Sequence, residues 1–330
     1  MNRRNTVLAL LALGAAGGPL AAEAPQSKGK TAHIGILVGG SVSQRGHLEQ
    51  ALLEGLRDQG YVEGRNLVIE RRYADGRNER VPEYARELAA MKLDLIVTTC
   101  TPSTRAARQA SASTPIVMAA VADPVGQRLI TSLARPGANI TGLSSQAEVI
   151  LPKMMELFSG VLPKPATVAV FLQERSDVHP RMWLQLAPIA QALKLKLVKI
   201  EVAYAADLSV AFAMALRENA NAVFVLPDEP MFLTRRGRIV ELAAKHRLPA
   251  FYGAREFVDD GGLMSYGESL RTAYRHAASY VKHVARGVMP ADLPVEQPTK
   301  FELVINQKTA EALGMTIPQS LLVRADHVIQ

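Results

Sequence analysis

The feature that most constrains this chain is the alternation of short apolar runs with segments of helical periodicity. The run at 33–38 has the composition of a buried strand, and Leu48, Leu52 and Leu56 then recur at helical spacing. The alternation continues, with strands expected at 66–71, 93–98, 115–121, 167–172, 195–202, 221–226, 249–252 and 301–305, and helices at 80–91, 102–112, 180–193, 207–218, 230–246 and 268–286. Such a pattern is typical of parallel sheets covered by helices on both faces.

Two series of strands within 330 residues predict an α/β fold of two doubly wound parallel-sheet lobes joined by a hinge. We expect the first lobe to combine residues 32–141 with about 267–330, and the second lobe to contain residues 142–266. Segments 141–145 and 262–267, which contain Gly142, Gly262 and Gly267, are the expected hinge.

The first 24 residues have the pattern of a secretory signal peptide. Arg3 and Arg4 precede an apolar core at 7–18 that is too short for a stable membrane span, and cleavage is expected after Ala22 or Ala24. The paired arginines leave the Sec and twin-arginine routes both open, and an uncleaved membrane-anchor helix is the alternative. The sequence therefore predicts a periplasmic protein, an oxidising location in which a lone cysteine is unsurprising.

Composition and motifs argue against several classes of protein. The formal charge is +7, but basic and acidic residues are interleaved and only 5% of residues are aromatic, so no nucleic-acid surface is predicted. One cysteine excludes a disulfide framework, and His276 and His283 are too far apart on one helix to share a metal ion. Nucleotide-binding and hydrolase motifs are missing, so we predict no catalytic residue, metal or cofactor, and leave open an exported enzyme with a nonstandard site.

Ligands of open parallel sheets bind beyond the carboxyl ends of the strands, where this chain carries hydroxyls and acids. We expect Thr101 to be the N-cap of a helix whose free amides hold a carboxylate, with an ordinary cap as the alternative. Asp123 and Asp228 either cap turns or pair with a ligand cation. The candidate ligand-binding residues are Ser41, Thr101, Ser103, Thr104, Asp123, Ser144 and Asp228, together with the aromatic residues Phe171, Tyr252 and Tyr266, which either cover a ligand or belong to the core.

Segments in order along nearly the whole mature chain give it a resemblance to a known family. They read GLRDQGYVEGRN at 55–66, ADPV at 122–125, SLARPGANITGLS at 132–144, GLMSYG at 262–267, PADLPVEQPT at 290–299 and LLVRAD at 321–326. With these segments, the chain resembles the substrate-binding proteins of ABC importers, in the group of tryptophan- and phenylalanine-type binders. It departs from the family pattern at Ala138, Thr99, Cys100, His327 and Gln330.

The resemblance implies a periplasmic binding protein of type I-like fold, in which two lobes enclose a small ligand. It implies an extracytoplasmic solute-binding component that delivers an amino acid or organic acid, aromatic ones included, to an ABC permease in the inner membrane. The protein is then a monomer, needs no cofactor and is not an enzyme. A sensory module that presents its ligand to a receptor is the alternative on the same fold.

Overall fold

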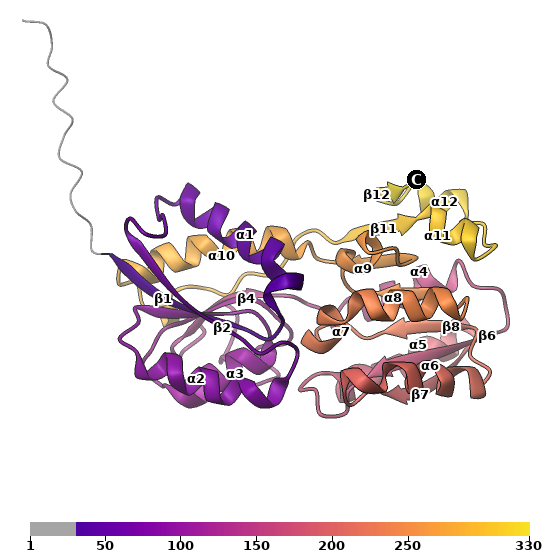
Figure 1. Cartoon of the computed structure of the whole chain (residues 1–330), viewed down its shortest axis with the longest axis horizontal. Helices are drawn as coiled ribbons and strands as arrows, with labels where there is room; N and C mark the ends of the chain where they lie inside the picture. Colours follow the sequence, from indigo (N-terminus) through magenta and orange to yellow (C-terminus); the bar gives the residue numbers. More distant parts are fainter. Residues whose placement is uncertain (1–30) are drawn as a thin grey trace, which may run out of the picture. The chain divides into compact units, whose positions relative to one another are not determined.

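A computed structural model describes residues 31–330, and the expected signal peptide lies outside the described residues. Residues Ala32–Gln330 contain two sheets with helices on both faces of each, so the α/β fold of two parallel-sheet lobes is confirmed (Figure 1). Within this part of the chain, no helix combines the length and the apolar character that a membrane span requires.

The first sheet has five parallel strands in the order β2-β1-β3-β4-β5. Their bounds are β1 Ala32–Val38, β2 Leu67–Tyr73, β3 Leu95–Thr98, β4 Ile116–Val121 and β5 Ile140–Ser144. The helices that pack on this sheet are α1 Val42–Asp58, α2 Val81–Ala90, α3 Thr101–Ala110 and α10 Leu270–Ala285, and the short helix η1 Asn78–Arg80 precedes α2.

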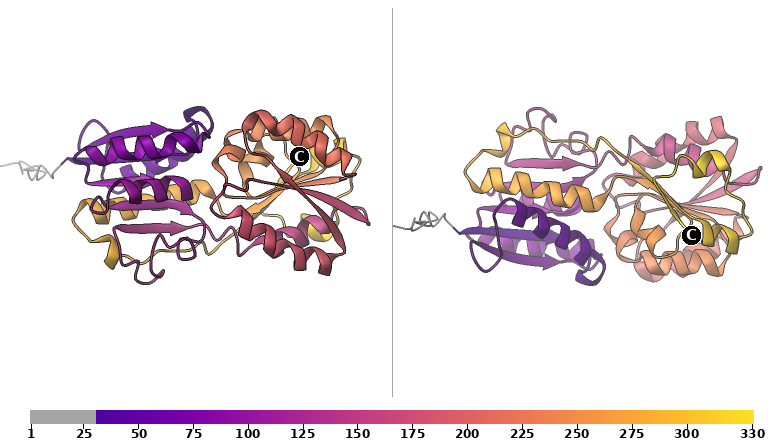
Figure 2. Two further views of the ribbon diagram at one scale, coloured as in Figure 1. Left: turned by 90° about the horizontal axis from the view of Figure 1, so that it is seen from below. Right: turned by 90° about the horizontal axis from the view of Figure 1, so that it is seen from above.

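Each face of the first sheet has its own apolar core. Helices α1 and α10 lie side by side over one face, where Leu52 and Ala277 are buried (Figure 2). Their close approach requires a glycine, because a side chain at Gly55 would come within 2.3 Å of the carbonyl oxygen of Arg275. Helices α2 and α3 cover the opposite face, and Leu88 is buried there. Burial on both faces explains why β3 and β4 read as largely apolar runs, whereas the edge strand β2 is partly exposed and carries charged residues.

The second sheet has seven strands in the order β12-β11-β10-β9-β8-β6-β7. Their bounds are β6 Ala166–Leu172, β7 Leu195–Glu201, β8 Ala222–Val225, β9 Ala250–Tyr252, β10 Met264–Gly267, β11 Glu302–Asn306 and β12 His327–Ile329. All neighbouring strands are parallel except β10 and β11, which are antiparallel.

Helices α4 Leu151–Ser159 and α5 His179–Leu193 cover one face of the second sheet, with Phe158 and Met182 in the core. The other face is covered by α6 Leu208–Arg217, α7 Pro230–Thr234 and α8 Arg236–Lys245, around Phe212. The remaining elements are α9 Arg255–Asp259, α11 Gln307–Ala312, α12 Gln319–Leu322, η2 Ala205–Asp207 and η3 Pro290–Asp292.

The residues after α10 are divided between the two sheets differently from what we expected. Residues 267–330 are expected in the first lobe, and α10 does pack on the first sheet. The chain then follows β5, where Leu143 pairs with Glu296, and crosses at about 297–301 so that β11 and β12 join the second sheet. Residues 302–329 therefore belong with the second sheet, because β10 offers β11 an open edge that sequence periodicity does not reveal.

Gly142 in the expected hinge is required by the fold itself. Its φ is +125°, and a side chain there would come within 2.2 Å of the carbonyl oxygen of Met118 on β4. Gly142→Val should therefore lower the free energy of unfolding by about 3 kcal/mol or more, from backbone strain and overpacking.

Chemical denaturation of the empty protein measures this effect. Gly46→Ala is the matched control, because Gly46 lies in α1 with open space around it, and there alanine should stabilise by at most about 1 kcal/mol. Equal stability of Gly142→Val and the parent protein would contradict the assignment.

Candidate ligand-binding site

A crevice lies where the carboxyl ends of strands from both sheets come together. From the first sheet, its walls include the ends of β3, β4 and β5, and from the second sheet the residues that follow β8, β9 and β10. Its lining is mostly apolar, with Ile150, Phe232, Leu233 and Phe257 among the larger side chains. This is the position at which parallel sheets place small-molecule sites.

The start of α3 forms one wall and differs by one residue from the expected cap. Cys100 is the N-cap and Thr101 the first helical residue, while Ser103 Oγ accepts from the amides of Thr99 and Cys100. Since Thr101 does not cap the helix, its hydroxyl is directed elsewhere and donates to Asp228 Oδ2 at 3.1 Å. This contact joins a residue on the first sheet to a loop of the second.

Asp228 lies in a left-handed turn that a buried histidine supports. Its φ is +64°, a conformation that aspartate tolerates better than most residues. His179 Nδ1 accepts from the amide of Gln173 at 2.9 Å, and Nε2 donates to the carbonyl oxygen of Pro227 at 2.8 Å. Burial lowers the pKa of His179 to about 4, so the ring is neutral and fixes the loop next to the acid.

Two polar atoms of the crevice are buried and have no hydrogen-bond partner among the described residues. They are Ser145 Oγ, directly after β5, and Glu268 Oε1, directly after β10. Buried polar groups in folded proteins are nearly always paired, since leaving one unpaired costs about 1–3 kcal/mol. Atoms of this kind in the wall of a crevice indicate groups that a ligand satisfies.

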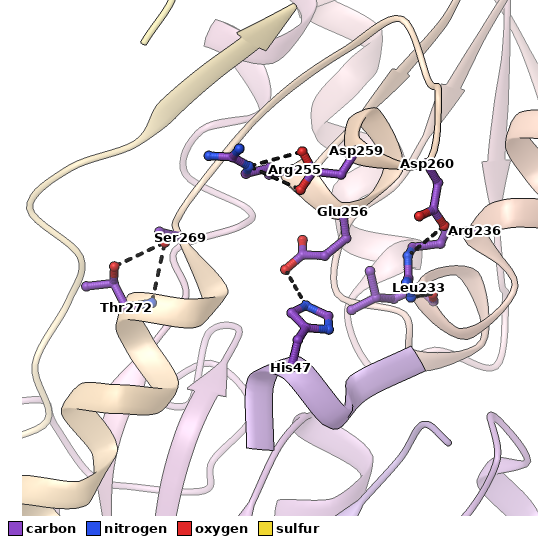
Figure 3. A network of polar contacts seen from close by, with 9 residues as sticks. All are labelled: His47, Leu233, Arg236, Arg255, Glu256, Asp259, Asp260, Ser269 and Thr272. Atoms are coloured by element: carbon purple, nitrogen blue, oxygen red, sulfur yellow. Dashed lines mark hydrogen bonds and ion pairs between the residues drawn. The ribbon is translucent and has the colours of Figure 1, made fainter. Parts of the chain in front are cut away.

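Glu268 is an acid of the crevice whose pKa is strongly shifted. Burial raises the pKa of its carboxyl group to about 8, with smaller contributions from the negative charges of Asp228 and Glu256. Three acids close together in a shielded site favour a cation. Glu256 itself lies 3.4 Å from His47 Nε2 on α1, and Ser269 caps α10 immediately after Glu268 (Figure 3).

Further polar contacts connect the elements of the first sheet to those of the second. Asp123 pairs with Arg181 at 3.0 Å, and Arg105 pairs with Asp177 at 3.0 Å. Partly exposed pairs of this kind contribute little each, typically below about 1 kcal/mol. They hold the two lobes together in this conformation without filling the crevice.

The structure brings only some of the candidate residues to the crevice. Asp228 lines the crevice, and Thr101 contacts it through the hydrogen bond described above without itself being among the lining residues. Ser144 immediately precedes the crevice residue Ser145. It lines a neighbouring cavity, and Glu268 lines both this cavity and the crevice. Asp123 has φ +40°, and besides pairing with Arg181 it accepts from the amide of Gly126 at 2.8 Å. The carboxylate of Asp123, which we expected to cap a turn or to pair with a ligand cation, therefore has both kinds of partner within the protein.

The other hydroxyl candidates serve local structure. Ser41 is the N-cap of α1, and its Oγ lies 3.2 Å from that of Ser43. Ser103 and Thr104 are buried in the first turn of α3, where both donate to the carbonyl oxygen of Cys100. None of the three is among the residues that line the crevice.

The three aromatic candidates lie away from the crevice. Phe171 is fully buried and packs edge-on against Phe212, so it belongs to the core, which was the alternative to a ligand contact. Tyr252 is fully buried behind the crevice wall, stacked on Phe257 at 4.5 Å. Tyr266 packs against Phe301 at 5.9 Å on the side of the second sheet that carries α4.

Sequence reasoning missed Ser145, Glu268 and Phe257. Ser145 and Glu268 each follow a strand, so the strand-end rule applied to β5 and β10 would have found both. Phe257 lies on α9, a helix of five residues that is too short to show helical periodicity in the sequence.

Comparison with known proteins identifies the class. A family model described as ABC transporter substrate binding protein matches residues 34–329, so the chain belongs to this family of binding proteins.

Individual relatives agree with this assignment. A tyrosine-binding protein of Clostridioides difficile (strain R20291) is 26% identical over 268 residues, which are 81% of this chain and 76% of the relative. The ABC domain from Streptococcus pneumonia in complex with L-Trp is 25% identical with a TM-score of 0.82, over 91% of this chain and 100% of that one. A conserved domain protein from Vibrio cholerae O1 biovar eltor is 30% identical with a TM-score of 0.83, over the same shares.

The raised pKa of Glu268 predicts a pH-dependent stability. The folded protein keeps this proton up to about pH 8, whereas the unfolded chain loses it near 4.5, so stability should fall as pH rises between these values. Between pH 7 and 8, where His179 is neutral in the folded protein and mostly neutral in the unfolded chain, Glu268 should contribute a slope of at most about 1.4 kcal/mol per pH unit.

Urea denaturation across this pH range tests the assignment. Glu268→Gln should remove most of this slope, whereas the exposed Glu241→Gln on α8 should retain it. Identical pH profiles for the parent protein and Glu268→Gln would show that Glu268 is ionised in the folded state.

Proposed function

We propose that this protein binds an amino acid with an aromatic side chain in the crevice between its lobes and delivers it to an ABC permease. The observation that carries the proposal is the pair of unpartnered buried atoms, Ser145 Oγ and Glu268 Oε1, in an otherwise apolar crevice at the strand ends. Two relatives, a tyrosine-binding protein and a domain in complex with L-Trp, support this ligand class.

The chemistry of the walls suggests how an amino acid would lie. The ligand ammonium group would approach Glu268 and Asp228, and its positive charge would favour the ionised form of Glu268. The carboxylate would lie toward Ser145 Oγ and the amino-terminal end of α3, where the helix dipole favours a negative charge. The side chain would pack against Phe232 and Phe257, which are the aromatic rings of the crevice lining.

Binding would then be coupled to closure of the two lobes. A ligand shifts the population toward the closed form only by its preference for that form, and a nearly complete shift takes about 5 kcal/mol. Two or three charge-assisted hydrogen bonds of about 1.5–3 kcal/mol each supply this amount. The strand ends of both lobes contribute such groups, so the full set of contacts would form only on closure.

Isothermal titration calorimetry with L-tryptophan, L-tyrosine, L-phenylalanine and L-leucine tests the ligand class. We expect the aromatic amino acids to bind more tightly than leucine. Glu268→Gln and Asp228→Asn should each weaken binding about tenfold or more, through loss of a charged partner for the ammonium group. Glu241→Gln is the control and should bind as the parent protein does. Lack of binding by every amino acid, or affinities unaffected by both crevice substitutions, would contradict the proposal.

The transport role is tested with membrane vesicles that contain an ABC permease and ATPase from the same organism. The ligand-loaded protein should stimulate ATP hydrolysis and uptake, and the Glu268→Gln protein at the same ligand concentration should do so less. Tight amino-acid binding without any effect on the transporter would instead favour the sensory role. The location outside the cytoplasm, the monomeric state and the lack of catalytic turnover belong to the same proposal.

A further inference from the structure

A second cavity lies in the second lobe, and its lining shares no residue with that of the crevice. It is bounded by α8, the start of β9, the loop before β10, and α11. Leu248 and Leu263 precede β9 and β10, so this cavity lies toward the amino ends of those strands, whereas the crevice lies at their carboxyl ends. We name it the α8–α11 pocket.

The walls of this pocket are built from residues fixed by the fold. Val240, Leu248 and Leu263 are buried and form apolar surface. The hydroxyl of Thr309 on α11 donates to the carbonyl oxygen of Gly261 at 2.8 Å, which ties the loop before β10 to α11. The pocket is therefore a part of the second lobe alone and does not depend on the position of the first.

A phenol without a partner lies in the wall of the pocket. Tyr252 is completely buried, and its Oη has no hydrogen-bond partner among the described residues. The Cε2 edge of its ring, next to the hydroxyl, lies against Gly262, where a side chain would come within 2.6 Å. Both Gly262 and Tyr252 are among the residues that line the pocket. A phenylalanine would fill this position without an unpaired polar atom.

The charged residues that line the pocket are both positive. Arg247 and Lys308 are exposed side chains at its mouth, and no ion pair to either is found within residues 31–330. No acidic residue is among those that line the pocket. Two cations at the mouth, apolar walls and a hydroxyl in the interior fit an apolar anion with a polar group at its far end.

We propose that the α8–α11 pocket binds a small hydroxyaromatic carboxylate, with its carboxylate between Arg247 and Lys308 and its hydroxyl at Tyr252 Oη. Such a ligand has no ammonium group, so the acids of the crevice repel it and the two sites select different compounds. The α8–α11 pocket does not require the proposed amino-acid function of the crevice.

The experiment removes the hydroxyl group from the ligand, from the protein, and from both. Calorimetry with 4-hydroxyphenylacetate and with phenylacetate is carried out on the parent protein and on Tyr252→Phe, which keeps the ring stacked on Phe257. We expect Tyr252→Phe to weaken 4-hydroxyphenylacetate about tenfold and to change phenylacetate less than twofold. An equal effect on both compounds, or no binding of 4-hydroxyphenylacetate to the parent protein, would overturn the proposal.

Two further variants locate the carboxylate. Arg247→Gln combined with Lys308→Gln should weaken binding of both compounds about tenfold or more, while Lys245→Gln, at the end of α8 and outside the lining, should leave it unchanged. Glu268→Gln should also leave them unchanged. Binding that depends on Glu268 and not on Arg247 and Lys308 would place the compound in the crevice and overturn the proposal, whatever the outcome with amino acids.

The empty protein gives an independent check that does not need a ligand. Because the Tyr252 hydroxyl has no partner, Tyr252→Phe should unfold at the same urea concentration as the parent protein or at a higher one. A clear loss of stability would show that the hydroxyl is already satisfied within the protein, and would overturn its assignment to a ligand.

Discussion

The structure depends on one constraint, which is that buried parallel strands must be covered on both faces and therefore return through a helix after each strand. This rule fixes the direction of the strands of the first sheet and of β6 to β10 in the second, so within each set the carboxyl ends gather at one edge. The loops at these edges can carry polar groups without disturbing the core. In this protein they bring Thr101 and Asp228 within 3.1 Å although the two residues are 127 positions apart.

Several buried polar groups have no hydrogen-bond partner among the described residues, although most buried polar groups of the fold are paired. His179 shows the ordinary case, since both of its ring nitrogens have backbone partners and its pKa is lowered by burial. Ser145 and Glu268 differ from it because each leaves a buried oxygen without a partner at the crevice. A raised pKa at Glu268 is the electrostatic consequence of shielding an acid among acids, and a cation relieves it.

The crevice and the α8–α11 pocket share a wall. Phe257 lines the crevice, Tyr252 lines the pocket, and the two rings are stacked at 4.5 Å. Gly262 permits this arrangement, because a side chain there would meet the Tyr252 ring. The two cavities thus lie on opposite sides of one aromatic pair within the same lobe.

The sequence by itself determined the fold class, the family and the strand ends as the place to look for a site, because periodicity and local motifs record which segments are buried on both faces. It did not determine that β11 and β12 join the second sheet, that Phe171 is core, or that Glu268 borders the crevice. Those outcomes depend on which strand edge is open and on which side chains meet across the sheets. Only the tertiary structure decides them, since pairing and desolvation arise between residues that are distant in the chain.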